Sequence, residues 1–229
     1  MTWAELPVSE AVTQVFTTYM DRKVIRLLST MVRVLGPADG YNLYCREYAN
    51  DHRKLDSFDR EEFLSKLPDR SGICLDLGVG DGRISCEIAG RSDRFIGLDV
   101  SLGMLEQAVR RIPKAELVLA DLSKAIPIQS ESVDMVTGAF FFVHIKNADP
   151  VISEVQRVLK SGGAFIFNLI PQRREPELRA GKQRFKIKSY YHSPPQIEKL
   201  LDYYWFEWEV ETVSEGKGWV SKVYCCRKT

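Results

Sequence analysis

The 229-residue sequence predicts an α/β fold: a seven-stranded, mostly parallel sheet with helices on both faces and an antiparallel hairpin at the C-terminus. Three observations predict it. Short apolar runs alternate with helical periodicity, a glycine-rich loop follows the first of these runs, and two alternating runs flank a glycine turn near the chain end. Alternation of strand and helix signals is typical of parallel strands joined by helices.

The core elements can be placed by periodicity. Strands are expected near residues 72–78, 93–99, 115–120, 133–140 and 162–170, and helices near 83–90, 102–112, 148–160 and 194–205. Ser193-Pro194-Pro195-Gln196 predicts a capping box with Pro at the first helical position. The runs 207–214 and 219–226 predict the terminal hairpin, which adds one antiparallel strand to the sheet.

The glycine-rich loop indicates a ligand site. Ile73–Leu77 leads into Gly78-Val79-Gly80-Asp81-Gly82, and a helix-like stretch follows at once. Strand, glycine turn and helix together let backbone N–H groups approach a nucleotide-like ligand closely. The dinucleotide pattern Gly-x-Gly-x-x-Gly is not met, because the third glycine comes one residue early, at Gly82. That position argues against a nicotinamide cofactor.

Three carboxylates end successive predicted strands: Asp76, Asp99 and Asp121. In an open parallel sheet these ends face one crevice. Asp99 lies roughly 20 residues past the glycines, where a ribose-binding carboxylate is expected. Three acids suit a ligand with a ribose, an exocyclic amine and a cationic group better than a polyphosphate.

The residues before the core predict a helical extension. Apolar residues recur at three- and four-residue steps over 9–35, residues 36–40 end that pattern, and Tyr41–Leu67 also looks helical. The first stretch is expected to pack on the core, to pair subunits in a homodimer, or to form a lid. The predicted organisation is an extension at 1–67 that covers the site and a core at 68–229, with a basic, lid-like insert at 171–189.

The sequence resembles the class I S-adenosylmethionine-dependent methyltransferases, particularly their small-molecule, UbiE-like branch. The segments that carry the resemblance are Leu75–Gly82, Gly97–Ser101 with Met104-Leu105, Ala120–Leu122, Ser132–Val136, Val143–Ile145 and Glu154–Gly163. The resemblance covers about residues 40–229 except around 171–189. It implies a Rossmann-like core, S-adenosyl-L-methionine as cofactor and S-adenosyl-L-homocysteine as product.

The resemblance also implies roles for single residues toward the cofactor. Gly78 and Gly80 would pass under its methionine part, and Asp76 would hold its amino group directly or through water. Asp99 would accept both ribose hydroxyls, and Asp121 the adenine amine. The remaining cofactor-binding candidates are the ones that pack on the adenine ring, lie beside the sulfonium or reach the methionine end: Val100, Met104 and Leu122 for the ring, Phe140 for the sulfonium, and Tyr48 for the methionine end. Tyr48 has the alternative of a core tyrosine.

Methyl transfer is a direct displacement, so a base is needed only if the acceptor arrives protonated with a high pKa. His144 follows an aromatic run near the mouth of the fourth strand, where it would deprotonate the acceptor or hold the loop by a hydrogen bond. His192 precedes the last helix beside two tyrosines and is the second catalytic candidate. No cluster of His, Cys or Asp has metal-like spacing, so no metal site is predicted.

Arginines and lysines are dense at 172–188, on the substrate-facing rim. The stretch is expected to be a solvated loop or else a clamp for an acidic substrate, a phosphate or an RNA backbone. Arg173, Arg174, Tyr190 and Tyr191 are the substrate-binding candidates.

Bulk properties limit the partners. The formal net charge of +1 gives no global attraction to nucleic acid or membrane, and no apolar run approaches 18 residues. Five cysteines without metal spacing indicate free thiols in a reducing cytoplasm.

The sequence therefore predicts an S-adenosylmethionine-dependent methyltransferase acting on a small, aromatic or anionic molecule. The alternatives are an RNA (tRNA)-modifying methyltransferase, which the basic stretch favours, a non-catalytic scaffold of the same fold that docks a partner through residues 9–35, and a nicotinamide-dependent oxidoreductase.

Overall fold

The computed structural model describes residues 32–51, 59–216 and 218–229, and Val34–Thr229 forms one compact unit. The helices predicted within residues 9–31 lie outside the described residues. The described elements, in chain order, are β1 (Arg33–Leu35), α3 (Pro37–Asp51), α4 (Arg60–Ser65), β2 (Ser71–Leu77), α5 (Ser85–Gly90), β3 (Ser92–Asp99), α6 (Leu102–Arg111), β4 (Glu116–Leu119), β5 (Val133–Gly138), the 3-10 turn η2 (Phe142–His144), α7 (Ala148–Val158), β6 (Leu159–Leu169), β7 (Glu177–Ala180), β8 (Gln183–Ile187), α8 (Pro194–Tyr203), β9 (Phe206–Glu215) and β10 (Gly218–Lys228).

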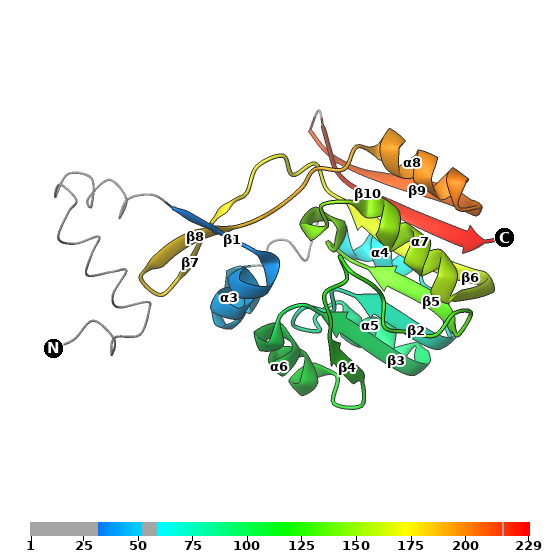
Figure 1. Ribbon diagram of the computed structural model, residues 1–229, viewed down its shortest axis with the longest axis horizontal. Coiled ribbons are helices and arrows are strands. Elements are labelled where there is room, and N and C mark those ends of the chain that lie inside the picture. Colours follow the sequence, from blue (N-terminus) through cyan, green and yellow to red (C-terminus); the bar gives the residue numbers. More distant parts are fainter. Residues whose placement is uncertain (1–31, 52–58, 217) are drawn as a thin grey trace, which may run out of the picture. The chain divides into compact units, whose positions relative to one another are not determined.

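The main sheet has seven strands in the order β4-β3-β2-β5-β6-β10-β9 (Figure 1). The strands from β4 to β6 pair in parallel, and β10 pairs antiparallel with both β6 and β9. The predicted parallel sheet with an antiparallel terminal hairpin is confirmed. Strand order reverses between β2 and β5, and ligands bind at such a switch point, at the carboxyl ends of the strands.

Helices cover both faces of this sheet, as predicted. On one face Ile152 of α7 and Leu201 of α8 are fully buried against Phe165 of β6. On the other face α4, α5 and α6 bury side chains such as Phe63 and Ile88. Burying one such side chain contributes about 1.5–3 kcal/mol, so the two apolar layers hold the sheet that carries the site.

Most boundaries agree with the periodicity within two residues. The larger difference is β6, which begins at Leu159, directly where α7 ends, instead of near 162. The capping box was wrong in its bonding. Ser193 is the N-cap and Pro194 follows it, but the Ser193 hydroxyl donates to the side-chain oxygen of Gln196 at 2.7 Å rather than accepting from the helix backbone.

The expected helix was wrong for residues 33–35, which form the strand β1. Lys188 N–H donates to the carbonyl of Leu35 at 2.8 Å, so the strand finds its partner 153 positions later in the chain. The helix α3 then begins at Pro37, inside the segment expected to end a helix, because proline suits the first helical turn.

The solvated loop expected at 172–188 was also wrong for its central part. β7 and β8 form an antiparallel hairpin around Gly181, which adopts φ +55°. Phe185 and Ile187 on β8 are buried against Tyr44 of α3. The basic residues alternate with apolar ones, and the apolar side of the hairpin packs on the helix.

Candidate functional site

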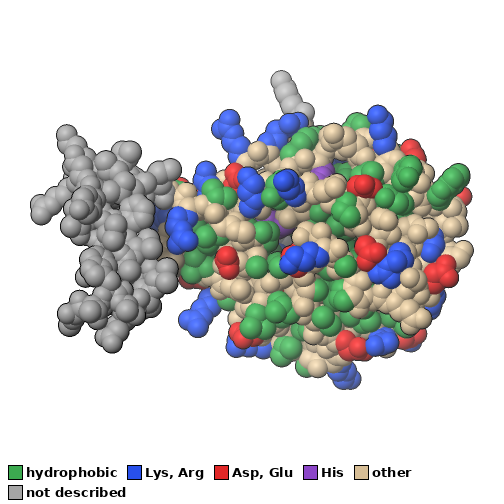
Figure 2. Space-filling view, in the orientation of Figure 1, with side chains coloured by type: hydrophobic (Ala, Val, Ile, Leu, Met, Phe, Trp, Pro, Cys, Tyr) green, Lys and Arg blue, Asp and Glu red, His purple; other side chains and the backbone are tan. Residues whose placement is uncertain are grey.

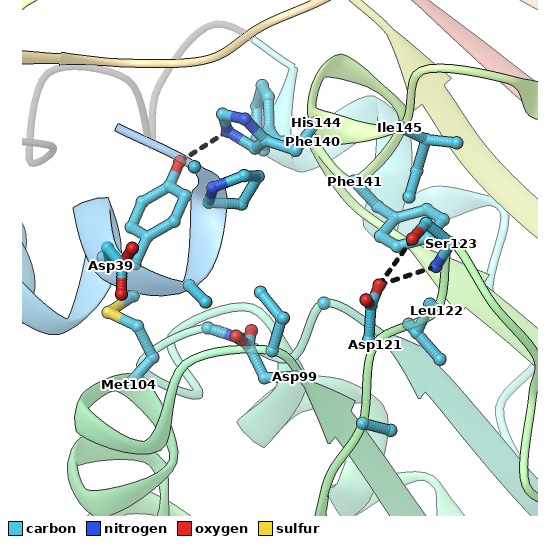
Figure 3. A pocket seen from close by; sticks show the side chains of 18 of the residues that line it. Asp39, Asp99, Met104, Asp121, Leu122, Ser123, Phe140, Phe141, His144 and Ile145 are labelled. Carbon is cyan, nitrogen blue, oxygen red and sulfur yellow. Dashed lines mark hydrogen bonds between the residues drawn. The ribbon is translucent and has the colours of Figure 1, made fainter. Parts of the chain in front are cut away.

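A cavity of about 460 Å³ lies at the carboxyl ends of β2, β3 and β5 (Figure 3). Its lining includes most of the residues predicted to bind the cofactor: Tyr48, Gly78, Gly80, Asp99, Val100, Met104, Asp121, Leu122 and Phe140. Asp76 is the one cofactor candidate outside this lining. The switch point of the sheet thus brings together positions that are spread over 93 residues of sequence, from 48 to 140.

The glycine loop forms the floor of the cavity. Gly78 and Gly80 adopt φ +74° and +57°, a region that other residues rarely enter. A Cβ on Gly78 would lie 3.1 Å from the Phe141 ring, so a side chain there would push on the core. The N–H groups of Gly78 and Val79 both donate to the carbonyl of Leu98, at 2.8 and 3.0 Å, which ties the loop to β3.

Asp99 stands at the end of β3, beside this loop. One carboxylate oxygen accepts from Gly80 N–H at 2.9 Å and the other from Ser101 N–H at 2.8 Å. Burial raises the pKa of Asp99 above its usual value, although these backbone hydrogen bonds oppose the shift. Each oxygen still has acceptor capacity toward the cavity, which suits a pair of ligand hydroxyls.

Asp121 follows β4 and is more exposed than Asp99. Its Oδ1 accepts from the Ser123 backbone N–H and hydroxyl, at 3.1 and 2.6 Å (Figure 3). Its Oδ2 pairs with Lys124 at 2.9 Å. The Ser123 hydroxyl is the main reason that the pKa of Asp121 is lowered. Leu122 and Met104 add apolar surface nearby, so this end of the cavity suits a flat ring with an amine.

Asp76 lies underneath the site and lines neither cavity described in this section. It is 3% exposed, and its oxygens accept from the Ser85 hydroxyl at 2.5 Å and the Thr137 hydroxyl at 2.7 Å. Burial raises the pKa of Asp76 to about 6. In this geometry the carboxylate links β2 to Ser85 at the start of α5 and to Thr137 on β5, and its role toward an amino group stays a prediction.

The sequence reasoning missed Tyr41, which contacts His144 across the cavity. The Tyr41 hydroxyl lies 2.7 Å from Nε2 of His144, a contact that Figure 3 marks with a dashed line. Nδ1 of His144 lies 2.9 Å from the carbonyl of Lys188. A carbonyl can only accept, so Nδ1 carries the hydrogen and Nε2 accepts from the Tyr41 hydroxyl in the neutral ring. Tyr41 and Tyr48 share a helix face at the i, i+7 spacing, a signal that marks both for the same surface.

Burial sets the protonation of this pair. It lowers the pKa of His144, and the Lys188 carbonyl opposes that shift only in part. It raises the pKa of Tyr41 well above the usual value, with Tyr48 and Asp99 adding to the shift. Near neutral pH both groups are therefore uncharged, and the Tyr41 hydroxyl keeps its proton and donates it in a hydrogen bond to Nε2 of His144.

Phe140 has a left-handed backbone, φ +55°, and its N–H donates to Oδ1 of Asn168 at 2.6 Å. The amide of Asn168 donates in turn to Oδ2 of Asp59 at 2.6 Å, and that oxygen also accepts from the Ser221 hydroxyl at 2.6 Å. Asp59 is 1% exposed, and burial raises its pKa. These three polar side chains, which the sequence reasoning did not single out, fix the backbone that presents Phe140 to the cavity.

Among the substrate candidates, Tyr190 lines the cavity and the others do not. The Arg173 guanidinium lies 3.9 Å from the centre of the Tyr191 ring, which indicates a cation–π contact. Nε2 of His192 lies 2.8 Å from the carbonyl of Ile145, a contact that holds the loop after η2. Arg174 lines neither cavity. The substrate and catalytic roles of these residues stay predictions.

A second, smaller cavity of about 110 Å³ adjoins the first. The two share the side chains of Tyr41, Tyr48, Phe140 and His144. The remaining lining of the smaller cavity comes from α3, from Arg83 between the glycine loop and α5, from η2, from the residues after β6 and from the β7–β8 hairpin.

Within residues 32–51, 59–216 and 218–229, no group of three or more His, Cys, Asp or Glu could hold a metal ion. In the same ranges, no helix combines the length and the apolar content that a membrane span requires.

Known proteins share this architecture and this sequence pattern. Residues 75–167 match the family described as "Methyltransferase domain". Malonyl-[acyl-carrier protein] O-methyltransferase of Salmonella typhimurium is 31% identical over 143 residues, which are 62% of this chain and 57% of that protein. Demethylmenaquinone methyltransferase of Lactobacillus johnsonii is 31% identical over 152 residues, which are 62% of this chain and 60% of that protein. The chain thus covers less than two thirds of the length of either relative.

A solved structure, described as "DhpI-SAM-HEP complex", has the same fold. It superimposes with a TM-score of 0.68 at 20% sequence identity, over 82% of this chain and 94% of that one. The matched domain includes the glycine loop, Asp99, Asp121 and Phe140. The sheet order and the matched segment lead to one conclusion: residues 75–167 match the family described as "Methyltransferase domain", and the chain has the fold of a solved structure described as a putative S-adenosylmethionine dependent methyltransferase from Listeria monocytogenes, with a TM-score of 0.65 over 76% of this chain.

Proposed function

We propose that the chain transfers a methyl group from S-adenosylmethionine to a small, aromatic or anionic molecule. The observation that carries the proposal is the larger cavity, where the predicted cofactor residues other than Asp76 and the Tyr41–His144 pair line the same space. Its volume lies within the range of about 300–1,000 Å³ that is usual for small-molecule sites.

The residues of the cavity fit the cofactor. Asp99 would hold the ribose, and Asp121 with Leu122 would hold the adenine. The aromatic face of Phe140 would favour the sulfonium cation. When bound, the cofactor supplies an electrophilic methyl group on sulfur.

Tyr41 and His144 give the site a path for the acceptor's proton. The Tyr41 hydroxyl would take that proton while giving its own to Nε2 of His144, 2.7 Å away. The ring is then held as imidazolium by the Lys188 carbonyl at Nδ1. A base of this kind is useful for a hydroxyl or another acceptor that reaches the site protonated.

The lining beside this pair supports a small acceptor. Pro37, Ile145 and Tyr190 provide apolar and aromatic surface, and Lys146 provides a positive charge at the same end. The names of two relatives point in a similar direction, since one acts on malonyl-[acyl-carrier protein] and the other on demethylmenaquinone. We therefore favour a quinol, a phenol or a carboxylic acid as acceptor.

The proposal can be tested by transfer of radiolabelled methyl from the cofactor. The purified chain would be incubated with pools of phenols, quinols and carboxylic acids, and in parallel with bulk tRNA. Label entering a small-molecule pool is the expected result. Label entering only tRNA, with binding that weakens steeply with salt, would favour the RNA alternative instead. Absence of cofactor binding by calorimetry would revive the scaffold alternative.

The domain organisation remains part of the proposal. Residues 1–67 are proposed to cover the site, and residues 9–35 to pack on the core, pair subunits or act as a lid. The described part of this segment already supplies Tyr41 and Tyr48 to the cavity. Deleting residues 1–31 and measuring both oligomeric state and methyl transfer separates these roles.

A further inference from the structure

The helix α3 makes two kinds of contact through neighbouring residues. Tyr41 lines both cavities and reaches His144, whereas the side chain of Asn42 contacts the start of α6. Successive residues of a helix point about 100° apart, so one turn of α3 can serve the site with one side chain and a second element with the other. The proposed function uses Tyr41 and leaves Asn42 unexplained.

Asn42 holds α6 by two hydrogen bonds to a single atom. Its Oδ1 accepts from the Ser101 hydroxyl at 2.8 Å and from the Gly103 N–H at 2.9 Å. A backbone N–H can only donate, so the oxygen of the amide, and not its nitrogen, must face α6. The Ser101 hydroxyl also has a fixed direction, because it accepts from the Met104 N–H at 3.2 Å and donates to Asn42.

The same contact leads to the side of the site where the cofactor is expected. Ser101 is fully buried, and its backbone N–H donates to Asp99 at 2.8 Å. Asp99 lines the larger cavity and is the expected partner of the ribose. Hydrogen bonds therefore run from Asp99 through Ser101 to Asn42. The next bond, from Tyr41 to His144, begins one residue away along α3.

Two glycines let α3 lie close to its neighbours. A Cβ on Gly103 would lie 2.8 Å from Sγ of Cys45 and 3.4 Å from Cα of Asn42, so a side chain there would push α3 away from α6. A Cβ on Gly40 would lie 2.6 Å from Ile187 of β8. Close packing of this kind lets a helix slide, whereas the directional hydrogen bonds of Asn42 hold it at one place.

We propose that Asn42 is a positioning residue: by holding α3 on the start of α6, it sets the place at which the Tyr41 hydroxyl meets Nε2 of His144. The role of Tyr41 in methyl transfer rests on the proposed function, whereas the position of α3 can be measured without turnover. Without Asn42, α3 would keep its contacts to the hairpin, such as that of Tyr44 with Phe185, and would lose its fixed distance from α6.

The first test is an NMR titration of the histidine rings, which needs neither cofactor nor acceptor. Burial lowers the pKa of His144, so in the unaltered chain this ring should titrate below its usual value of 6.5. In Asn42→Ala the displaced helix should let water reach the ring, and the pKa of His144 should rise toward 6.5. His144→Gln identifies the signal.

Three further variants separate position from folding. Asn42→Asp offers the same oxygen to both donors, so the pKa of His144 should stay near that of the unaltered chain. Asn42→Gln carries the amide one methylene further out, so the pKa should rise, and this variant replaces Asn42→Ala if the latter fails to fold. Arg46→Gln, at an exposed residue one turn along α3, is the matched control and should leave the His144 signal unmoved.

Two outcomes of the titration would overturn the proposal. One is a pKa of His144 that is the same in the unaltered chain as in Asn42→Ala or its replacement, because α3 would then stay in place without this side chain. The other is a pKa at or above 6.5 in the unaltered chain, because the ring would then not be covered.

The second test uses the acceptor that the methyl-transfer assay identifies. Asn42→Ala should lower kcat about 10- to 100-fold and leave KM within about twofold, because a base misplaced by roughly 1 Å loses turnover and not binding. In the Tyr41→Phe background the same substitution should have almost no further effect, since no hydroxyl is left to position.

Fully additive losses in the double variant would overturn the proposal, because they would give Asn42 a purely structural role. Failure of the proposed function has a different signature. If the unaltered chain bound no S-adenosylhomocysteine by calorimetry, the proposed function would fail, while the titration of His144 would still decide whether Asn42 positions α3.

Discussion

At the scale of single residues, Asp99 combines two tasks in one side chain. It holds the N–H groups of Gly80 and Ser101, and the same carboxylate faces the larger cavity. Its position after β3 follows from the apolar run that precedes it, and its partners follow from the parallel pairing of β2 with β3. The carboxylate therefore couples the shape of the loop to the ligand.

Asp99→Ala should weaken S-adenosylhomocysteine about 10- to 100-fold, because the ribose hydroxyls lose a charged acceptor. Calorimetry measures the dissociation constant directly. Asp93→Ala is the control, since that side chain is 60% exposed and pairs only with Arg70 among the residues described. An unchanged dissociation constant for the Asp99 variant would rule out the ribose assignment.

The Tyr41–His144 pair predicts a particular pH dependence. Burial lowers the pKa of His144, and only the neutral ring accepts a proton from Tyr41, so the acid limb of kcat/KM should lie below pH 6.5. Tyr41→Phe should lower kcat about 10²- to 10⁴-fold and leave cofactor affinity nearly unchanged. The loss should shrink above the pKa of the acceptor, where no base is needed. Tyr203→Phe is the control, because Tyr203 is 72% exposed. A loss that is equal at every pH would contradict the relay.

At the scale of elements, the β7–β8 hairpin determines what the basic stretch does. Arg184 pairs with Glu177 within the hairpin, and Lys188 pairs with Glu175 beside it, so part of the positive charge is neutralised locally. Figure 2 shows further Lys and Arg side chains on the surface around the segments that flank the hairpin. The apolar side of the hairpin meanwhile helps to line the smaller cavity through Leu178 and Ile187.

Reversing charge at Arg173→Glu together with Arg174→Glu should leave cofactor affinity within about twofold, because neither residue lines a cavity. For an anionic acceptor, KM should rise several-fold as electrostatic attraction at the rim is lost. Lys222→Glu on β10 together with Lys199→Glu on α8 is the control, because it changes the net charge by the same amount away from this stretch. Unaltered kinetics on an anionic substrate would end the clamp hypothesis.

The polar network behind Phe140 links three neighbouring strands: Asn168 on β6, Ser221 on β10 and the end of β5. Asn168→Ala should destabilise the chain by about 2–5 kcal/mol, because it removes two buried hydrogen bonds. These are the bond from the Asn168 amide to the Asp59 carboxyl and the bond from the Phe140 N–H to the Asn168 oxygen. Ser221→Ala removes only one donor and should cost about 1–2 kcal/mol. Urea denaturation measures both. Equal effects would show that Asn168 is not the centre of the network.

At the scale of the whole molecule, buried acids make stability depend on pH. The folded-state pKa of Asp76 is about 6, above its usual value of 3.8, because burial disfavours the charge. The folded state therefore binds this proton more tightly than the unfolded chain. The stability gained from Asp76 is full below its unfolded pKa and is lost as the pH rises through about 6.

Asp76→Asn removes that dependence, because the amide stays neutral at every pH. Relative to the parent chain, the variant should gain about 3 kcal/mol of stability between pH 4 and pH 7, from a shift of about two pKa units. Urea denaturation at several pH values measures the difference, and Asp93→Asn at an exposed site is the control. If the free energy of unfolding changed with pH in the same way for the variant and the parent, the pKa shift could not be assigned to Asp76.

Much of the fold could be predicted because its signals are local. The apolar runs of β2, β3 and β5 and the glycine loop depend on residues adjacent in sequence, and the cavity lies where their order places it. Periodicity could not predict β1 or the β7–β8 hairpin. Both are short, and each is stabilised by distant partners: Leu35 by Lys188, and Phe185 by Tyr44.

The sequence by itself determined the α/β order, the acids at the strand ends and the glycines between them, because each is specified by composition within a few positions. Only the tertiary structure decided which of these groups meet a ligand. Packing enclosed Asp76 beneath the loop, left Asp99 facing the cavity and joined Tyr41 to His144 across 103 positions of chain. Burial and hydrogen bonding between distant segments set those outcomes, and no local pattern encodes them.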